Sequence, residues 1–217
     1  MAHGVNRLWR VAGLLLLAGG VVMSAPVTTY GNTSLQNIQD VFADNAGVIA
    51  FGDQISLIPG PRGLNSIETR VATFTDALVA DFRLTLYALD PLQNVGAMLS
   101  SRVLTGVAIG ANSRQSLLFT GWTLTVPDDF VLLLSIENAS SLVLGLEVTD
   151  AASIGFSDST FSWWRDGSGF FRQSFAGTPN NYYFVVNTDA GAAVPEPGTA
   201  ILTLGSIITL AAVRRRL

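Results

Sequence analysis

The 217-residue chain has no cysteine and no lysine, and its single histidine is His3, close to the N-terminus. All 12 basic residues are therefore arginines. If the N-terminal segment is removed on export, the remaining chain cannot assemble a Ser–His–Asp triad, a Cys–His pair, a Schiff base or a zinc site of the His or Cys type. We expect no cofactor and no enzymatic activity.

The chain also lacks an excess of positive charge, since 16 acidic and 12 basic residues give a formal net charge of −4. Such a balance excludes binding to nucleic acid as a main function. Hydrophobic residues make up 49% of the chain and charged residues 13%. This is too apolar for a disordered protein, and both ends of the chain explain the excess.

At the N-terminus, Arg7 and Arg10 precede an apolar run from Val11 to Val22, which the small residues Ser24 and Ala25 follow. This order is typical of a secretory signal. Twelve apolar residues make about 18 Å of helix against a hydrocarbon core of roughly 30 Å. We therefore predict a signal peptide over residues 1–24, read by the general secretion machinery and removed by signal peptidase; an uncleaved anchor is the alternative.

The C-terminus carries three features in order: Pro195-Glu196-Pro197, an apolar stretch over residues 199–213, and Arg214, Arg215 and Arg216. The apolar stretch predicts a single short transmembrane helix. Because positive charge stays on the cytoplasmic side, the arginine cluster predicts a cytoplasmic C-terminus and a Pro-Glu-Pro motif on the outside.

This order over residues 194–217 resembles the PEP-CTERM sorting signal of exported proteins in Gram-negative bacteria that make exopolysaccharide. The resemblance implies an inner-membrane intermediate, processing by an exosortase at or near the motif, and a final place at the cell surface or in the extracellular matrix. Exopolysaccharide is a further partner that it implies. The alternative is a plain membrane anchor after a proline-rich linker.

We predict that residues 25–193 form one exported domain, which has seven arginines and fifteen acidic residues and therefore a formal charge of −8.

The apolar residues of this domain recur mostly with a period of two, and turn residues interrupt them every 8 to 15 positions. We predict an all-β fold, an antiparallel β-sandwich of jelly-roll type. The segments 52–57, 81–89 and 122–129 and the aromatic stretch after Phe156 are also similar to the β-sandwich cargo of PEP-CTERM proteins. The expected strands are 48–51, 54–58, 67–74, 81–87, 98–105, 114–120, 122–126, 130–136, 142–148 and 182–187. Only residues 34–42 carry a helical pattern, and they fit an irregular segment equally well.

The aromatic residues gather late in the domain, where Trp163-Trp164 and Phe170-Phe171 flank the turn Asp166 to Gly169. Neighbours in a strand point to opposite faces, so one member of each pair is expected to leave the core unless both faces are covered. An exposed ring beside polar groups can stack on a sugar. The alternative is a hairpin of 161–164 against 170–175 whose rings are all packed.

The remaining candidates are acidic. Asp158, Asp166 and Asp189 are candidate calcium ligands in β-sandwich loops, although aspartate is also favoured in turns for its geometry alone. A glycosidase would need two carboxylates across a sugar cleft. We therefore expect a non-catalytic surface or matrix protein; the alternative is a carbohydrate-binding module that uses Trp163, Trp164, Phe170 and Phe171, and a glycosidase comes third.

Overall fold

The computed structural model describes residues 25–33, 35–40, 49–74, 76–138, 145–149, 152–158, 160–174 and 181–189. Residues Pro26–Gly191 form one compact unit. The secondary structure of the described residues consists of strands. Among these residues there is no helix of the length and hydrophobicity that crossing a membrane requires. The predicted signal peptide (1–24), the sorting signal (194–217) and its membrane helix (199–213) lie outside the described residues.

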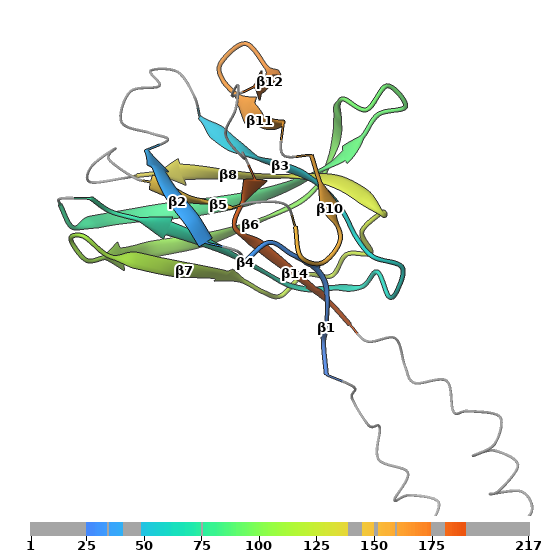
Figure 1. Cartoon of the computed structure of the whole chain (residues 1–217), viewed down its shortest axis with the longest axis horizontal. Coiled ribbons are helices and arrows are strands. Elements are labelled where there is room, and N and C mark those ends of the chain that lie inside the picture. The colour runs from blue at the N-terminus through green and yellow to red at the C-terminus, as the bar shows by residue number, and fades with distance from the viewer. Residues whose placement is uncertain are drawn as a thin grey trace, which may run out of the picture. The chain divides into compact units, whose positions relative to one another are not determined.

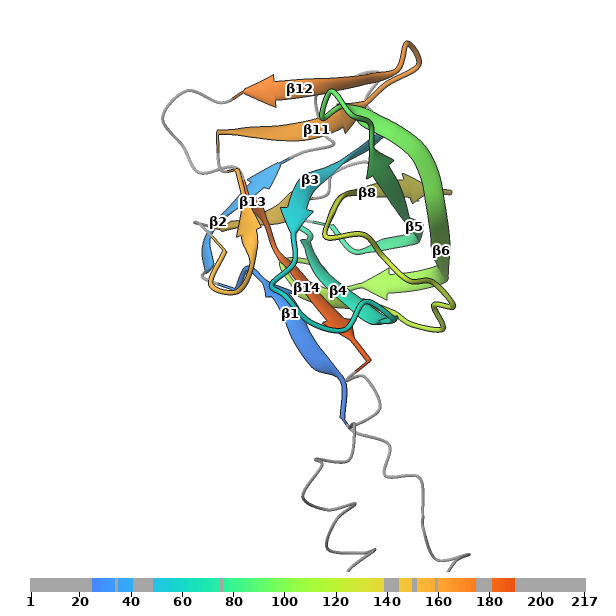
Figure 2. The ribbon, with the colours of Figure 1, turned by 90° about the vertical axis from the view of Figure 1, so that its right-hand side faces the viewer.

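The strands form two sheets, and every pairing between described strands is antiparallel (Figures 1 and 2). The first sheet has the order β1-β14-β4-β9-β13, with β2 beside β9 and β7 beside β4. Its strands are β1 (Val27–Gly31), β2 (Leu35–Asp40), β4 (Leu64–Ala72), β7 (Arg114–Phe119), β9 (Gly145–Thr149), β13 (Asn181–Tyr182) and β14 (Phe184–Thr188).

The second sheet has the order β12-β11-β3-β8-β5-β6, with β10 beside β3. Its strands are β3 (Ala50–Ser56), β5 (Leu78–Leu89), β6 (Val95–Ile109), β8 (Asp129–Glu137), β10 (Phe156–Ser157), β11 (Phe161–Arg165) and β12 (Phe170–Ser174).

The main hydrophobic core lies between the two sheets and takes alternate residues from each. Phe51, Phe82 and Phe130 enter it from the second sheet, and Ile67 and Phe184 from the first, all fully buried. The period-two pattern of the sequence places these residues on one face of their strands. The fold is therefore β-sandwich-like, and the all-β prediction is confirmed.

The first and last described strands lie side by side, with Val27 opposite Thr188 across the β1–β14 pair. Both ends of the unit therefore leave it at the same edge. Figures 1 and 2 both show the β11–β12 hairpin at the far end of the unit from the free ends of β1 and β14.

Four details of the expected strand pattern are wrong. The expected strand 182–187 is divided at Tyr183 between β13 and β14. Residues 34–42, with their helical pattern, contain strand β2, because pairing with β9 outweighs a weak local signal. The two expected strands 48–51 and 54–58 are one strand, β3, that runs through Gly52 and Asp53. Residues 122–126 form no regular strand: Gly63 and Thr125 make an isolated bridge, and Nε1 of Trp122 donates to the carbonyl of Phe119 at 3.0 Å.

Candidate functional site

The aromatic segment forms the hairpin that its turn sequence predicts. Strands β11 and β12 pair from Phe161 opposite Ser174 to Arg165 opposite Phe170. The turn is closed by a hydrogen bond of 3.0 Å from the Asp166 N–H to the Gly169 carbonyl. Gly169 has a φ of 144°, which residues with a side chain rarely adopt, so glycine is needed at this place.

Both tryptophans of the hairpin are buried, and the expectation that one of them stands exposed is wrong. Trp164 faces the core between the sheets, and its Nε1 donates to Oγ of Ser162 at 2.8 Å. Trp163 faces the opposite side, where it is only 3% exposed. Its cover is Arg172, whose guanidinium carbon lies 4.9 Å from the Trp163 ring centre.

Trp163 belongs to a second, smaller cluster on the outer face of the second sheet. Its buried members are Ala50, Tyr87, Val131, Leu133 and Trp163. A sheet with apolar side chains on both faces buries both members of an adjacent pair. Of the four candidate sugar-stacking rings, Phe170 is 37% exposed, Phe171 is half-buried and packs on the main core, and the two indoles are buried.

The second sheet curls over its own outer face. Strands β12 and β5 are separated by β11, β3 and β8, which in a flat sheet places them about 19 Å apart. The rings of Phe170 on β12 and Tyr87 on β5 nevertheless meet edge to face with centres 5.0 Å apart. Nη2 of Arg172 also donates to the carbonyl of Gln93, beyond β5, at 2.8 Å. The hairpin thus closes one end of a concave surface.

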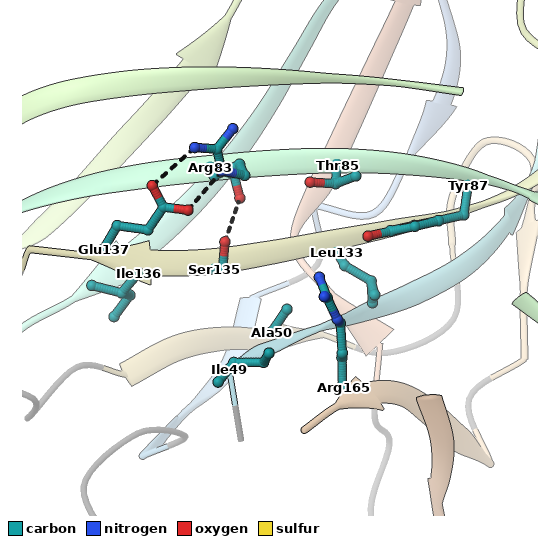
Figure 3. Close-up of a pocket in the computed structure, with 10 residues that line it drawn as sticks. All are labelled: Ile49, Ala50, Arg83, Thr85, Tyr87, Leu133, Ser135, Ile136, Glu137 and Arg165. Carbon is teal, nitrogen blue, oxygen red and sulfur yellow. Dashed lines mark hydrogen bonds and ion pairs between the residues drawn. The ribbon is translucent and has the colours of Figure 1, made fainter. Parts of the chain in front are cut away.

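A groove of about 310 Å³ lies in this concave surface (Figure 3). Its lining comes from four neighbouring strands or their ends: Ile49, Ala50, Arg83, Thr85, Tyr87, Leu133, Ser135, Ile136, Glu137 and Arg165. The volume is at the lower end of the range for small-ligand sites. Strand β5 contributes every second residue, Arg83, Thr85 and Tyr87, because side chains of successive residues in a strand leave opposite faces.

The charges in the groove are partly paired. Nε and Nη2 of Arg83 donate to Oε1 and Oε2 of Glu137 at 2.6 and 3.1 Å. These hydrogen bonds raise the pKa of Arg83 above its ordinary value. The guanidinium of Arg165 makes no hydrogen bond or ion pair with any residue that the structure describes, and its carbon lies 5.6 Å from the ring centre of Phe170.

The sequence contained a signal for part of this site. The alternation along β5 places Arg83, Thr85 and Tyr87 on the face away from the main core, as the expected strand 81–87 requires. That Glu137 of β8 and Arg165 of β11 join them depends on the strand order and on the curl of the sheet. These are long-range properties that a local pattern does not carry.

The three candidate calcium ligands occupy separate turns. Oδ1 of Asp158 accepts from the N–H and hydroxyl of Thr160 at 2.9 and 2.7 Å, and Oδ1 of Asp189 accepts from Asn65 at 3.0 Å. Hydrogen bonds from the Ser168 hydroxyl and backbone lower the pKa of Asp166. Within the described ranges, no group of three acidic or histidine side chains gathers as a metal site.

A buried carboxyl group was missed in the sequence. Asp53 lies between Phe51 and Ile55 on the inner face of β3 and is 1% exposed. Burial raises its pKa well above the ordinary value, and the hydrogen bond from the N–H of Tyr182 offsets this only in part. The neighbouring hydroxyl of Tyr30 donates to Ser157 at 3.0 Å, and Ser157 donates to Asn181 at 2.8 Å. The alternation Phe51, Asp53, Ile55 was the available signal.

The sorting motif Pro195, Glu196 and Pro197 and the cluster Arg214, Arg215 and Arg216 lie outside the described residues, so the structure neither supports nor opposes those assignments. No family model matches the chain, and no curated protein or solved structure is found to be similar to it.

Proposed function

We propose that the chain is an exported, non-catalytic protein of the cell surface or extracellular matrix of a Gram-negative, exopolysaccharide-producing bacterium. An exosortase would sort it through its C-terminal signal. The observation that carries this proposal is the order of Pro195-Glu196-Pro197, the apolar stretch 199–213 and the arginine cluster at the end of the chain. The secretory pattern at residues 1–24 supports the same route.

The chemistry of the domain supports a non-catalytic role. Residues 25–193 contain no histidine, cysteine or lysine. Among the residues that line the groove, Glu137 is the sole carboxylate, and Arg83 binds both of its oxygens. Glycoside hydrolysis needs a pair of carboxyl groups flanking the bond, so the glycosidase alternative lacks its second group here.

The jelly-roll type of the sandwich belongs to this proposal as well. Its support is that the chain passes repeatedly between the sheets: β3, β5 and β8 belong to one sheet, while β4, β7 and β9 belong to the other. Connections that cross from sheet to sheet are typical of Greek-key and jelly-roll sandwiches.

The sorting proposal is tested by expressing the full chain in an exosortase-containing host, in the same host without its exosortase, and with alanine at Pro195, Glu196 and Pro197. Mass spectrometry of the mature C-terminus and cell fractionation are the measurements. We expect removal of the C-terminal segment only for the parent chain in the exosortase host. Identical processing in all three samples would show that the segment is a plain anchor.

A second candidate function, a carbohydrate-binding module, is favoured by one observation: the groove on the outer face of the second sheet combines hydroxyl, charged and apolar groups. The hairpin that closes it lies at the far end from β1 and β14. A glycan array with the full chain tests this function, and a reducing-sugar assay on retained glycans separates binding from hydrolysis. We expect retention without release of sugar.

A further inference from the structure

The groove carries one unpaired positive charge. Of its three charged side chains, those of Arg83 and Glu137 bind each other through two hydrogen bonds, whereas the side chain of Arg165 makes none with the described residues. The domain around it has a formal charge of −8. An arginine with no ion-pair partner among the described residues is therefore a local exception in a strongly acidic domain. The overall charge of the domain by itself disfavours acidic ligands.

The groups around Arg165 are those that a polar, ring-shaped ligand needs. Figure 3 shows Arg165 and Tyr87 directed into the same space from opposite walls, with Thr85 beside them and Leu133 between. The hydroxyls of Tyr87 and Thr85 make no hydrogen bond within the described part of the chain. Ile49, which is 45% exposed, and the half-buried Ile136 provide an apolar surface on which the C–H groups of a sugar ring can lie.

We propose that this groove binds a uronic acid residue of an acidic saccharide, with the carboxylate on Arg165. A guanidinium matches a carboxylate with two parallel hydrogen bonds, which a neutral sugar cannot offer. The hydroxyls of Thr85 and Tyr87 would bond ring hydroxyls, and the volume of about 310 Å³ suits a single small ligand unit. This inference rests on the second proposed function and names its ligand class.

The negative domain limits which acidic saccharides are expected to bind. A long polyanion brings many charges near a surface with a formal charge of −8, while a short one places one carboxylate on Arg165. Binding is therefore expected to favour short uronides, and the affinity is expected to fall as salt screens the attraction between Arg165 and the carboxylate.

The test is isothermal titration of the full chain in a polyoxyethylene detergent, which has no sugar headgroup, with trigalacturonic acid. The matched ligand is the same trisaccharide with its carboxylates reduced to alcohols. The variant is Arg165→Gln, and its control is Arg114→Gln, which removes the same charge from β7 in the other sheet. We expect the acidic trisaccharide to bind, the reduced one to bind at least about tenfold more weakly, and Arg165→Gln to lose about tenfold or more in affinity while Arg114→Gln matches the parent.

Several outcomes overturn the inference. Equal binding of both trisaccharides, or unchanged binding by Arg165→Gln, would leave a carbohydrate module whose site or ligand class is different. Acetate that competes with the trisaccharide at equal concentration would show a carboxylate site with no preference for sugar. If neither trisaccharide binds and the glycan array is also empty, the carbohydrate function fails together with the site.

Discussion

The backbone N–H of Tyr182 on β13 donates a hydrogen bond of 2.6 Å to Oδ2 of Asp53 on β3, so a strand of one sheet is tied to a carboxyl group of the other. The second carboxyl oxygen, Oδ1, is buried and has no hydrogen-bond partner among the described residues. A carboxylate in this place would bury an unpaired negative charge, which is costly. The neutral acid is therefore the form that the folded state favours.

The buried acid makes the stability of the domain depend on pH. In the unfolded chain Asp53 ionises near its ordinary pKa of about 3.9, whereas the folded domain keeps the proton to a much higher pH. Between these two pKa values the folded state binds more protons, so the contribution of Asp53 to stability is complete below its unfolded pKa and falls as pH rises, by up to about 1.4 kcal/mol per pH unit. Thermal unfolding at pH 5 to 8 measures this slope.

The variant Asp53→Asn is expected to remove most of that slope, because the amide stays neutral and its oxygen can still accept from Tyr182. The matched control is Asp90→Asn. The hydrogen bond from the backbone of Asn94 is the main cause that lowers the pKa of Asp90, so this carboxylate contributes stability that is lost only in acid. Its replacement is expected to leave the slope between pH 5 and 8 unchanged. An equal slope in parent and Asp53→Asn would contradict the assignment of a protonated Asp53.

Asp53 also shows what the sequence could and could not predict. Alternation correctly indicated strands with one buried face, and the same alternation places Asp53 on that face beside Phe51. An aspartate side chain, however, is normally expected to be exposed to solvent. No local pattern reveals its hydrogen-bond donor, the N–H of Tyr182, which is 129 positions away in the chain. The partner of a buried polar group is set by strand order, which emerges only in the folded domain.

The hairpin gives the same lesson for the site. Its turn and its strands could be predicted because Asp166 and Gly169 act locally. The burial of Trp163 could not, since its cover is Arg172 and the cluster around Tyr87, brought there by the curl of the whole sheet. The groove is a consequence of that curl, so neither it nor the place of Arg165 in its lining was visible in the sequence.

Gly52 is predicted to be irreplaceable for steric reasons. A Cβ atom at this position on β3 would lie 1.8 Å from the carbonyl oxygen of Leu132 on β8. The substitution Gly52→Ala therefore forces two central strands apart and is expected to cost about 1–3 kcal/mol or more. Urea unfolding measures the cost. Gly167→Ala is the control, because nothing lies within 4 Å of its added methyl group, and it is expected to stay within about 0.5 kcal/mol of the parent.

The C-terminal arginines are predicted to set the membrane orientation of the unprocessed chain. Alanine at Arg214, Arg215 and Arg216 removes the positive charge that we propose holds the C-terminus on the cytoplasmic side, so membrane retention and orientation are expected to weaken. Lysine at the same three positions keeps the charge and is expected to behave as the parent. Protease protection in membrane vesicles, with a C-terminal epitope, reports the orientation. Retention of the parental topology by the alanine variant would contradict this prediction.

Both hairpin tryptophans are predicted to be structural. Trp163 and Trp164 are 3% and 7% exposed, in different clusters on opposite faces of the sheet, so each change to alanine is expected to cost about 3–5 kcal/mol in urea unfolding. Phe156→Ala is the control for loss of an aromatic ring, since Phe156 is 64% exposed and its removal is expected to cost no more than about 0.5 kcal/mol.

The substitutions Trp163→Phe and Trp164→Phe are predicted to differ in their effect on stability. Trp164 loses the hydrogen bond from its Nε1 to Ser162, whereas the buried Nε1 of Trp163 has no partner among the described residues to lose. Removing an unsatisfied buried donor relieves a desolvation cost, while removing a satisfied one leaves Ser162 without its donor. Trp164→Phe is therefore expected to be the more destabilising of the two by about 1 kcal/mol or more. The reverse order would mean that Nε1 of Trp163 has a hydrogen-bond partner. A Trp163→Ala variant as stable as Phe156→Ala would mean that Trp163 stands open to solvent and is again a candidate for stacking on a sugar.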